Sequence, residues 1–160
     1  MEKKTFPNQN FKEVRILFLG RIIPQKDILK YIDLVFLMTK QKIKLPVSYC
    51  VYGEFESETY KDFILKYIDK KELNDRIVFK GFSDKKSIFS NHSINFLIHT
   101  TQKIQPEPFG RVLIDANYYG AIPITNGFGG ASEVIFNKKN GYISSDIKVT
   151  KEIILSYLNC

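Results

Sequence analysis

The sequence of 160 residues contains few of the side chains used in disulfide, metal or redox chemistry: two cysteines, two histidines and no tryptophan. Cys50 lies inside an apolar run and Cys160 is the last residue, so we expect two free thiols in the reducing cytoplasm rather than a disulfide framework. No apolar run reaches the roughly 18 residues that a membrane span needs. Residues 1–13 are polar and lack the apolar core of a signal peptide. These absences predict a soluble cytoplasmic protein.

Several signatures of nucleotide and hydrolytic chemistry are also absent. No G-x-G-x-x-G follows the first apolar run, and there is no Walker phosphate loop and no G-x-S-x-G elbow. Dinucleotide oxidoreductases, P-loop enzymes and serine hydrolases therefore lose support. No D-x-D pair occurs, and Glu54, Glu56 and Glu58 have no histidine near them, so we read these acids as favourable charges at a helix start. We predict no metal and no other cofactor.

The composition predicts one globular domain with a basic surface. Apolar residues make up 44% and charged residues 26% of the chain, and the formal net charge is +7. A positive charge favours anionic partners such as nucleic acid, anionic lipid or a phosphorylated small molecule. Basic residues are spread along the chain without an arginine-rich block, which argues against nucleic acid. A solvated lysine-rich surface and a phosphate ligand both remain open.

Apolar runs typical of buried strands alternate with segments of helical periodicity. This order predicts an α/β fold: a doubly wound, mainly parallel, Rossmann-like sheet of about six strands with helices on both faces. We expect one domain over residues 14–160, preceded by an extension or linker remnant over 1–13. The expected strands are 14–20, 46–53, 76–81, 94–100, 121–125 and, weakly, 141–144, and the expected helices are 26–40, 57–71, 84–91, 109–119, 131–137 and 148–158.

In such sheets ligands bind at the carboxyl ends of the strands, so the residues after each strand are the candidates. GRIIPQK follows the first strand, and its Arg21 and Lys26, near a helix start, suit a diphosphate. The simpler alternative is that Arg21 and Lys26 are solvated surface charges with no ligand. After the third strand, Ser83 or Asp84 is expected to cap the next helix.

The stretch PEPFGRVLID follows the fourth strand. Pro108 is expected near a helix start, which leaves the amides of the next residues unpaired. Glu107 lies before this helix, where a favourable interaction with the helix dipole would also explain it. Asp115 follows Val112, Leu113 and Ile114, so it is expected beside buried surface; it is either a solvated or capping acid, or an acid with a partner such as ligand hydroxyls.

The remaining candidates are a glycine-rich loop and the histidines. The three glycines of TNGFGGASEVI would let the backbone approach a ligand closely, with Glu133 facing the same cleft, although a plain loop is equally compatible. His99 ends the fourth strand and is a candidate for ligand contact. His92 is expected at the surface or as a capping residue.

Four stretches, in order, resemble the carboxyl-terminal, donor-binding half of a GT-B fold, family 4 (group 1) retaining glycosyltransferase. EPFGRVLID resembles the family's E-x7-E motif, with Glu107 and Asp115 as its acids. GRIIPQK resembles its phosphate-binding segment, and VFKGF and TNGFGGASEVI follow in family order. The resemblance runs from VRILFLGRI to NGYIS.

The resemblance implies a role for each candidate. Arg21 and Lys26 would neutralise the donor diphosphate and stabilise charge on the leaving group without a metal. Glu107 would hold sugar hydroxyls and Asp115 the ribose, and we find no convincing proton-transfer base. The catalytic residues implied are Arg21, Lys26 and Glu107, and the donor-binding residues are Gly20, Gly53, Glu54, Gly81, Phe82, His99, Pro108, Phe109, Gly110, Arg111, Val112 and Asp115.

Three positions depart from the family pattern. Asp115 replaces the usual glutamate and is one methylene shorter, so its contact with ribose is expected to be weaker or water-mediated. Asp27 stands where glycine is common, which puts a negative charge close to the phosphate site. His99-Thr100 replaces Pro-Ser, which changes the loop that precedes Glu107.

The resemblance also implies the wider setting. The donor would be a UDP- or GDP-sugar, and the acceptor a glycan or lipid-linked glycan of surface polysaccharide synthesis, bound by an amino-terminal domain outside this chain. The full-length enzyme would be cytoplasmic, with peripheral association at the inner face of the membrane, and this half alone would transfer little or no sugar. The alternative is a non-catalytic, Rossmann-like nucleotide-binding or regulatory module.

Overall fold

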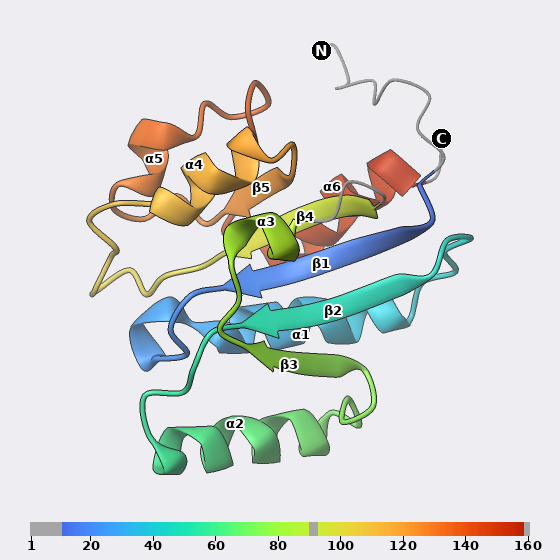
Figure 1. Cartoon of the computed structure of the whole chain (residues 1–160), viewed down its shortest axis with the longest axis vertical. Coiled ribbons are helices and arrows are strands. Elements are labelled where there is room, and N and C mark those ends of the chain that lie inside the picture. The colour runs from blue at the N-terminus through green and yellow to red at the C-terminus, as the bar shows by residue number, and fades with distance from the viewer. Residues whose placement is uncertain (1–10, 90–92, 159–160) are drawn as a thin grey trace.

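The computed structural model describes residues 11–89 and 93–158, and within them the chain forms one parallel sheet (Figure 1). The strand order is β3-β2-β1-β4-β5-β6, and all neighbouring strands pair in parallel. The order reverses between β1 and β4, as in Rossmann-like domains. The strands are β1 (Glu13–Leu19), β2 (Val47–Tyr52), β3 (Ile77–Gly81), β4 (Ser93–His99), β5 (Ile122–Thr125) and β6 (Tyr142–Ile143).

Helices cover both faces of this sheet, which confirms the doubly wound α/β architecture. One face packs against α1 (Ile28–Thr39), α2 (Glu58–Lys70) and α6 (Ile147–Leu158). The other carries the short helices α3 (Lys85–Ile88), α4 (Arg111–Tyr118) and α5 (Ala131–Val134). A 3-10 turn, η1 (Pro24–Lys26), joins β1 to α1.

The central strands are buried on both faces, which explains their continuous apolar sequences. Ile16 and Phe96 face the larger core beneath α1 and α6, whereas Leu17 and Leu97 face the smaller core beneath α3 and α4. Burying one such side chain contributes about 1.5–3 kcal/mol. Cys50 is also buried and is a free thiol.

The predicted strands lie within about one residue of the observed ones, but the helices after β3, β4 and β5 are shorter than predicted. The helix expected over 109–119 begins at Arg111, because Gly110 has a non-helical backbone and serves as the N-cap. Pro108 therefore lies in the preceding loop. Asp84 caps α3 as predicted, since its carboxylate accepts a hydrogen bond from the Ser87 amide. The chain becomes extended again at Phe89 and Ile135, which ends α3 and α5 early.

Some expectations fall outside the described residues: most of the 1–13 extension, His92 and Cys160. None of the described helices is long and apolar enough to cross a membrane.

Candidate functional site

A cavity of about 700 Å³ opens at the carboxyl ends of β1, β2 and β3, bordered by α3 and α4. This size is typical of small-molecule sites. It brings together residues from separate stretches of the sequence. Of the expected site residues, it is lined by Gly20, Arg21, Lys26, Gly53, Glu54, Gly81, Phe82, Glu107, Arg111, Val112 and Asp115.

Glycines at the three strand ends shape one wall of this cavity. The Gly20 amide donates to the Tyr52 carbonyl at 3.0 Å, and the Gly53 amide donates to the Gly81 carbonyl at 2.9 Å. Gly53 has a φ of +139°, and a Cβ atom there would lie 1.8 Å from the Gly20 carbonyl oxygen. A side chain at residue 53 would therefore push the ends of β1 and β2 apart.

Lys26 and Glu107 meet inside the cavity. The Lys26 Nζ lies 2.5 Å from Glu107 Oε2, and the two side chains are 14% and 21% exposed. Partial burial alone would raise the pKa of Glu107, but hydrogen bonds from His99 and Lys26 outweigh it and lower the pKa to about 2. Glu107 is therefore ionised at neutral pH, so it can accept hydrogen bonds from a ligand but has no proton to donate.

His99 holds Glu107 from outside this cavity. His99 is 4% exposed, with Nε2 at 2.8 Å from Glu107 Oε2 and Nδ1 at 3.0 Å from the Thr125 hydroxyl. The Thr125 oxygen also accepts a hydrogen bond from the Gly127 amide. A neutral imidazole with its proton on Nε2 satisfies this whole network. The structure thus places His99 behind Glu107 and outside the lining of this cavity.

Asp115 already has a partner. Lys85 of α3 approaches its carboxylate at 2.5 Å, and both residues line the cavity. Sequence reasoning missed Lys85 because SDKK was considered only as a capping segment, and nothing in the sequence indicates that α3 lies beside α4. Asp115 therefore has a partner within the chain, whereas the sequence suggested ligand hydroxyls for that place.

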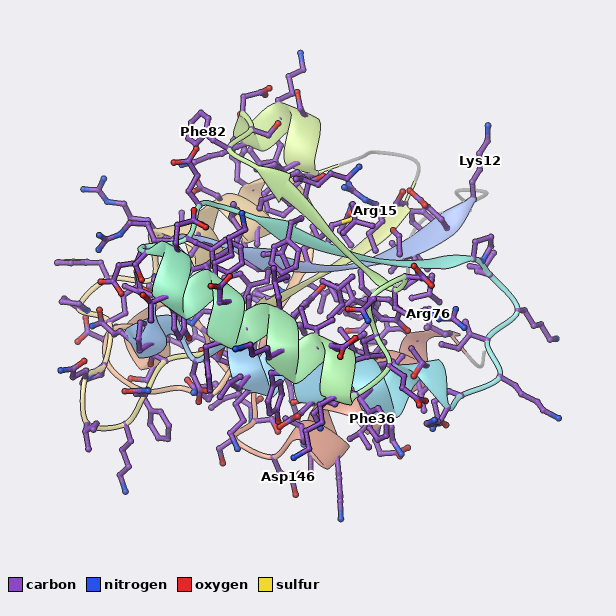
Figure 2. The ribbon with its side chains drawn as sticks, turned by 90° about the horizontal axis from the view of Figure 1, so that it is seen from below. Lys12, Arg15, Phe36, Arg76, Phe82 and Asp146 are labelled. Atoms are coloured by element: carbon purple, nitrogen blue, oxygen red, sulfur yellow. The ribbon has the colours of Figure 1, made fainter. Side chains whose placement is uncertain are left out.

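Two arginines and an aromatic ring complete the lining. Arg21 and Arg111 are exposed, and the ion pairs found within the described residues do not include them. Phe82 is 87% exposed beside α3 (Figure 2). The cavity thus offers two exposed guanidinium groups and one exposed aromatic face.

The glycine-rich loop after β5 packs closely against the segment that contains Glu107. Cβ atoms at Gly129 and Gly130 would lie 2.2 Å from the Glu107 carbonyl oxygen and 2.0 Å from the Pro108 carbonyl oxygen. The Gly130 amide donates to the Glu107 carbonyl at 3.0 Å. These glycines let the loop pack against the backbone around Glu107 and so help to position that residue. The cavity lining includes neither Glu133 nor the expected Pro108, Phe109 and Gly110.

Asp27 occupies a left-handed backbone conformation between η1 and α1, with a φ of +45°. Glycine adopts this conformation without steric cost, and aspartate is among the few other residues that tolerate it. This explains physically why a glycine is expected there and why an aspartate can replace it. In the described part of the chain, no cluster of three or more His, Cys, Asp and Glu side chains could hold a metal ion.

The chain matches the model of the family "Glycosyl transferases group 1" over residues 1–158. No curated protein sequence matches it. The solved structure of Anabaena HepE in complex with UDP-glucose superposes with a TM-score of 0.75 at 23% identity, over 90% of this chain and 38% of HepE. A variant of S. aureus TarM in complex with fondaparinux, α-GlcNAc-glycerol and UDP superposes with a TM-score of 0.78 at 24% identity, over 96% of this chain and 30% of TarM.

A glycosyltransferase from Rickettsia africae gives a TM-score of 0.76 at 20% identity, over 92% of this chain and 38% of its own. The chain therefore spans less than half of the length of each of these three proteins. At these identities the similarity shows a shared fold.

Proposed function

This chain belongs to the group 1 glycosyltransferases, and we propose that it binds the nucleotide-sugar donor of a retaining, metal-independent enzyme of surface polysaccharide synthesis. The observation that carries the proposal is the cavity at the ends of β1, β2 and β3. It gathers Arg21 and Lys26, Gly81 and Phe82, and the acids of the EPFGRVLID stretch around one space.

The diphosphate would lie against the cations. Arg21 has no acid partner within the described residues, and an exposed guanidinium can bind phosphate oxygens in a bidentate manner. Lys26 lies at the end of η1, where its ammonium is held beside the cavity by Glu107. Two cations at the leaving group would stabilise the negative charge that grows on the departing diphosphate.

The sugar would lie against Glu107. This carboxylate is ionised and is held from two sides by His99 and Lys26, so its free lone pairs can accept hydrogen bonds from sugar hydroxyls with little loss of side-chain entropy. The low pKa of Glu107 argues against a role as general acid and agrees with a role in binding the sugar of the donor.

The nucleoside would lie between α3 and α4. Phe82 offers an exposed ring for contact with the base, and stacking on an aromatic side chain does not depend strongly on which base is bound. Asp115 would accept hydrogen bonds from the ribose, in competition with Lys85, which already contacts its carboxylate. This competition is a physical reason to expect a weaker ribose contact than a free glutamate would give.

HepE and TarM were crystallised with UDP-glucose and with UDP, respectively, which supports a UDP-type donor for this chain. The family match favours the enzyme reading over a regulatory Rossmann-like module. We further propose that the acceptor binds to a separate domain and that the chain alone transfers little or no sugar.

Calorimetric titration with UDP, GDP and ADP tests the proposal. We expect at least one of them to bind at millimolar concentration or better, without added magnesium and with no loss of affinity in a chelator. If none of the three binds, the cavity is not a nucleotide-diphosphate site and the proposal is wrong.

A further inference from the structure

Arg15 is a buried arginine within the apolar strand β1. It is 7% exposed and is not part of the lining of the 700 Å³ cavity at the ends of β1, β2 and β3, which we call the donor cavity. Its side chain lies on the side of the sheet that carries α3 (Figure 2). An arginine is rarely buried unless its guanidinium is paired, because taking the charge out of water is costly. An apolar side chain would fill this place without that cost, so the contacts of the guanidinium call for an explanation.

The contacts of Arg15 tie the ends of a strand and a helix together. Its Nη2 donates to the Tyr52 hydroxyl at 2.7 Å, and its Nη1 donates to the Ile88 carbonyl. The Glu13 carboxylate lies 3.9 Å from its Nε and supplies a partial counter-charge. Tyr52 is the last residue of β2 and Ile88 is the last residue of α3, and both line the donor cavity. The guanidinium of Arg15 therefore lies directly behind the wall of this cavity.

The helix α3 depends on such contacts for its position. It spans only four residues, and a helix this short is not stable by itself. Asp84 caps its amino end, whereas the carbonyls of the last turn of a helix have no partner within the helix. Arg15 supplies the partner of the Ile88 carbonyl. In turn, α3 carries Lys85, whose ammonium contacts Asp115 in the donor cavity.

We propose that Arg15 is a positioning residue of the donor cavity and acts on the bound nucleoside through α3. By holding the end of α3, it keeps Lys85 beside Asp115 and fixes the wall against which the ribose and the base would lie. Its contacts do not include Arg21 and Lys26, which would bind the diphosphate. The proposal rests on the proposed function of this cavity.

Arg15→Met removes the charge and both hydrogen bonds and keeps an unbranched side chain. We expect the affinity for UDP to fall about tenfold, because α3 is no longer held. The affinity for inorganic pyrophosphate, which has no nucleoside, should stay that of wild type. Arg15→Lys keeps the charge but replaces the forked guanidinium by a single ammonium, so we expect UDP affinity to fall about threefold. Calorimetry measures both affinities, and Arg15→Lys decides the question if Arg15→Met does not fold.

Hydrogen exchange measured by NMR distinguishes a released α3 from general destabilisation. The amides of Ile88 and Phe89 make backbone hydrogen bonds within α3, so they should exchange about tenfold faster in Arg15→Met, because α3 opens locally. The matched control is Ile64→Ala in α2, which removes a buried side chain from the larger core. This control loses stability but should keep wild-type exchange at these two amides and wild-type affinity for UDP.

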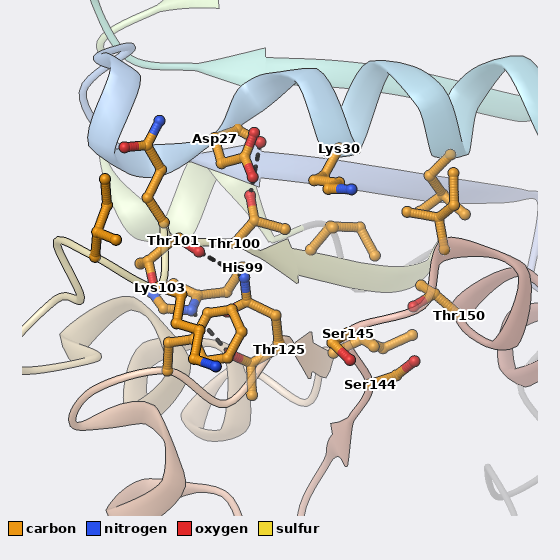
Figure 3. Close-up of a pocket in the computed structure, with 18 residues that line it drawn as sticks. Asp27, Lys30, His99, Thr100, Thr101, Lys103, Thr125, Ser144, Ser145 and Thr150 are labelled. Carbon is orange, nitrogen blue, oxygen red and sulfur yellow. Dashed lines mark hydrogen bonds between the residues drawn. The ribbon is translucent and has the colours of Figure 1, made fainter.

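A second cavity has to be distinguished in the titrations. It has a volume of about 450 Å³ and lies at the carboxyl ends of β4 and β5, on the face of the sheet that carries α1 and α6 (Figure 3). Residues of α3 are not among those that line it. UDP should therefore shift the NMR signals of Gly81 and Lys85 in the donor cavity and leave the signal of Ser145 in the second cavity unchanged.

The outcomes separate the role of Arg15 from the donor site itself. If wild type does not bind UDP, or if UDP shifts Ser145 instead of Gly81, the proposed function fails and the role of Arg15 fails with it. The role of Arg15 alone is overturned if wild type binds UDP in the donor cavity and Arg15→Met binds it equally well. It is also overturned if Arg15→Met loses UDP and pyrophosphate affinity to the same extent, or if its α3 amides exchange no faster than those of Ile64→Ala.

Discussion

Breaking the Lys26–Glu107 ion pair should destabilise the protein measurably. Removing one partner of a buried pair costs about 3–5 kcal/mol, whereas an exposed pair contributes about 0.2–1 kcal/mol. Because these two side chains are 14% and 21% exposed, we place the cost of Lys26→Met between these limits, at about 2 kcal/mol. For a domain of this size that corresponds to a Tm lower by roughly 4–8 °C.

A double-mutant cycle measured by urea unfolding isolates the pair. Lys26→Met, Glu107→Gln and the double variant should give a coupling energy of about 1–2 kcal/mol, because the double variant leaves no uncompensated charge. The exposed pair of Lys61 with Glu58, at 4.0 Å, provides a control cycle with an expected coupling of about 0.3 kcal/mol. If the two cycles give the same small coupling, the ion pair does not organise the site and the reasoning fails.

Three further predictions concern single residues. The pKa of Glu107 in the folded protein, about 2, lies below its ordinary value of 4.5, so its stabilisation is complete above pH 4.5 and is lost as the pH falls toward 2. The free energy of unfolding of wild type, measured in urea, should therefore fall more steeply over that range than that of Glu107→Gln. Parallel curves for the two proteins would contradict this. Gly53→Ala should cost more than about 2 kcal/mol, because a Cβ atom would meet the Gly20 carbonyl oxygen. Gly120 also has a positive φ, +76°, but has open space around the added Cβ atom, so Gly120→Ala should cost only about 1 kcal/mol. Equal losses in denaturant unfolding would refute the steric argument. Asp115→Ala should weaken UDP binding about tenfold in calorimetry through loss of charge-assisted hydrogen bonds; unchanged UDP binding in Asp115→Ala together with tighter binding in Asp115→Glu would mean that aspartate does not replace the glutamate of the family motif.

The sheet could be predicted from the sequence because its strands are buried on both faces and so have continuous apolar sequences. Their order along the chain, with helical segments between them, left few alternatives to a parallel sheet. The lengths of the short helices were harder to predict, because α3 and α5 span four residues each. A segment of four residues is too short to show a helical periodicity of apolar residues. The start of α4 was predicted two residues too early, because Gly110 has a non-helical backbone and acts as the N-cap.

Contacts between distant segments could not be predicted from the sequence. The Arg21, Lys26 and Glu107 stretches were expected near one another because all of them follow strands. The contact between Asp115 and Lys85 was not expected, because Lys85 reaches Asp115 only through the packing of α3 beside α4. His99 was expected to face a ligand, and its burial behind Glu107 depends on Thr125, which belongs to a neighbouring strand. Such pairings are fixed by tertiary packing, which local sequence does not encode.

The central claim is that a nucleotide diphosphate binds at the carboxyl ends of β1, β2 and β3 with Arg21 on its phosphates. Calorimetric titration of Arg21→Ala and Arg76→Ala with UDP tests it most directly. Arg76 is also exposed, but it precedes β3 and so lies at the amino ends of the strands, away from the cavity (Figure 2). The account predicts at least tenfold weaker binding for Arg21→Ala, from the loss of charge-assisted hydrogen bonds, and wild-type affinity for Arg76→Ala. Equal affinity of the two variants would contradict it.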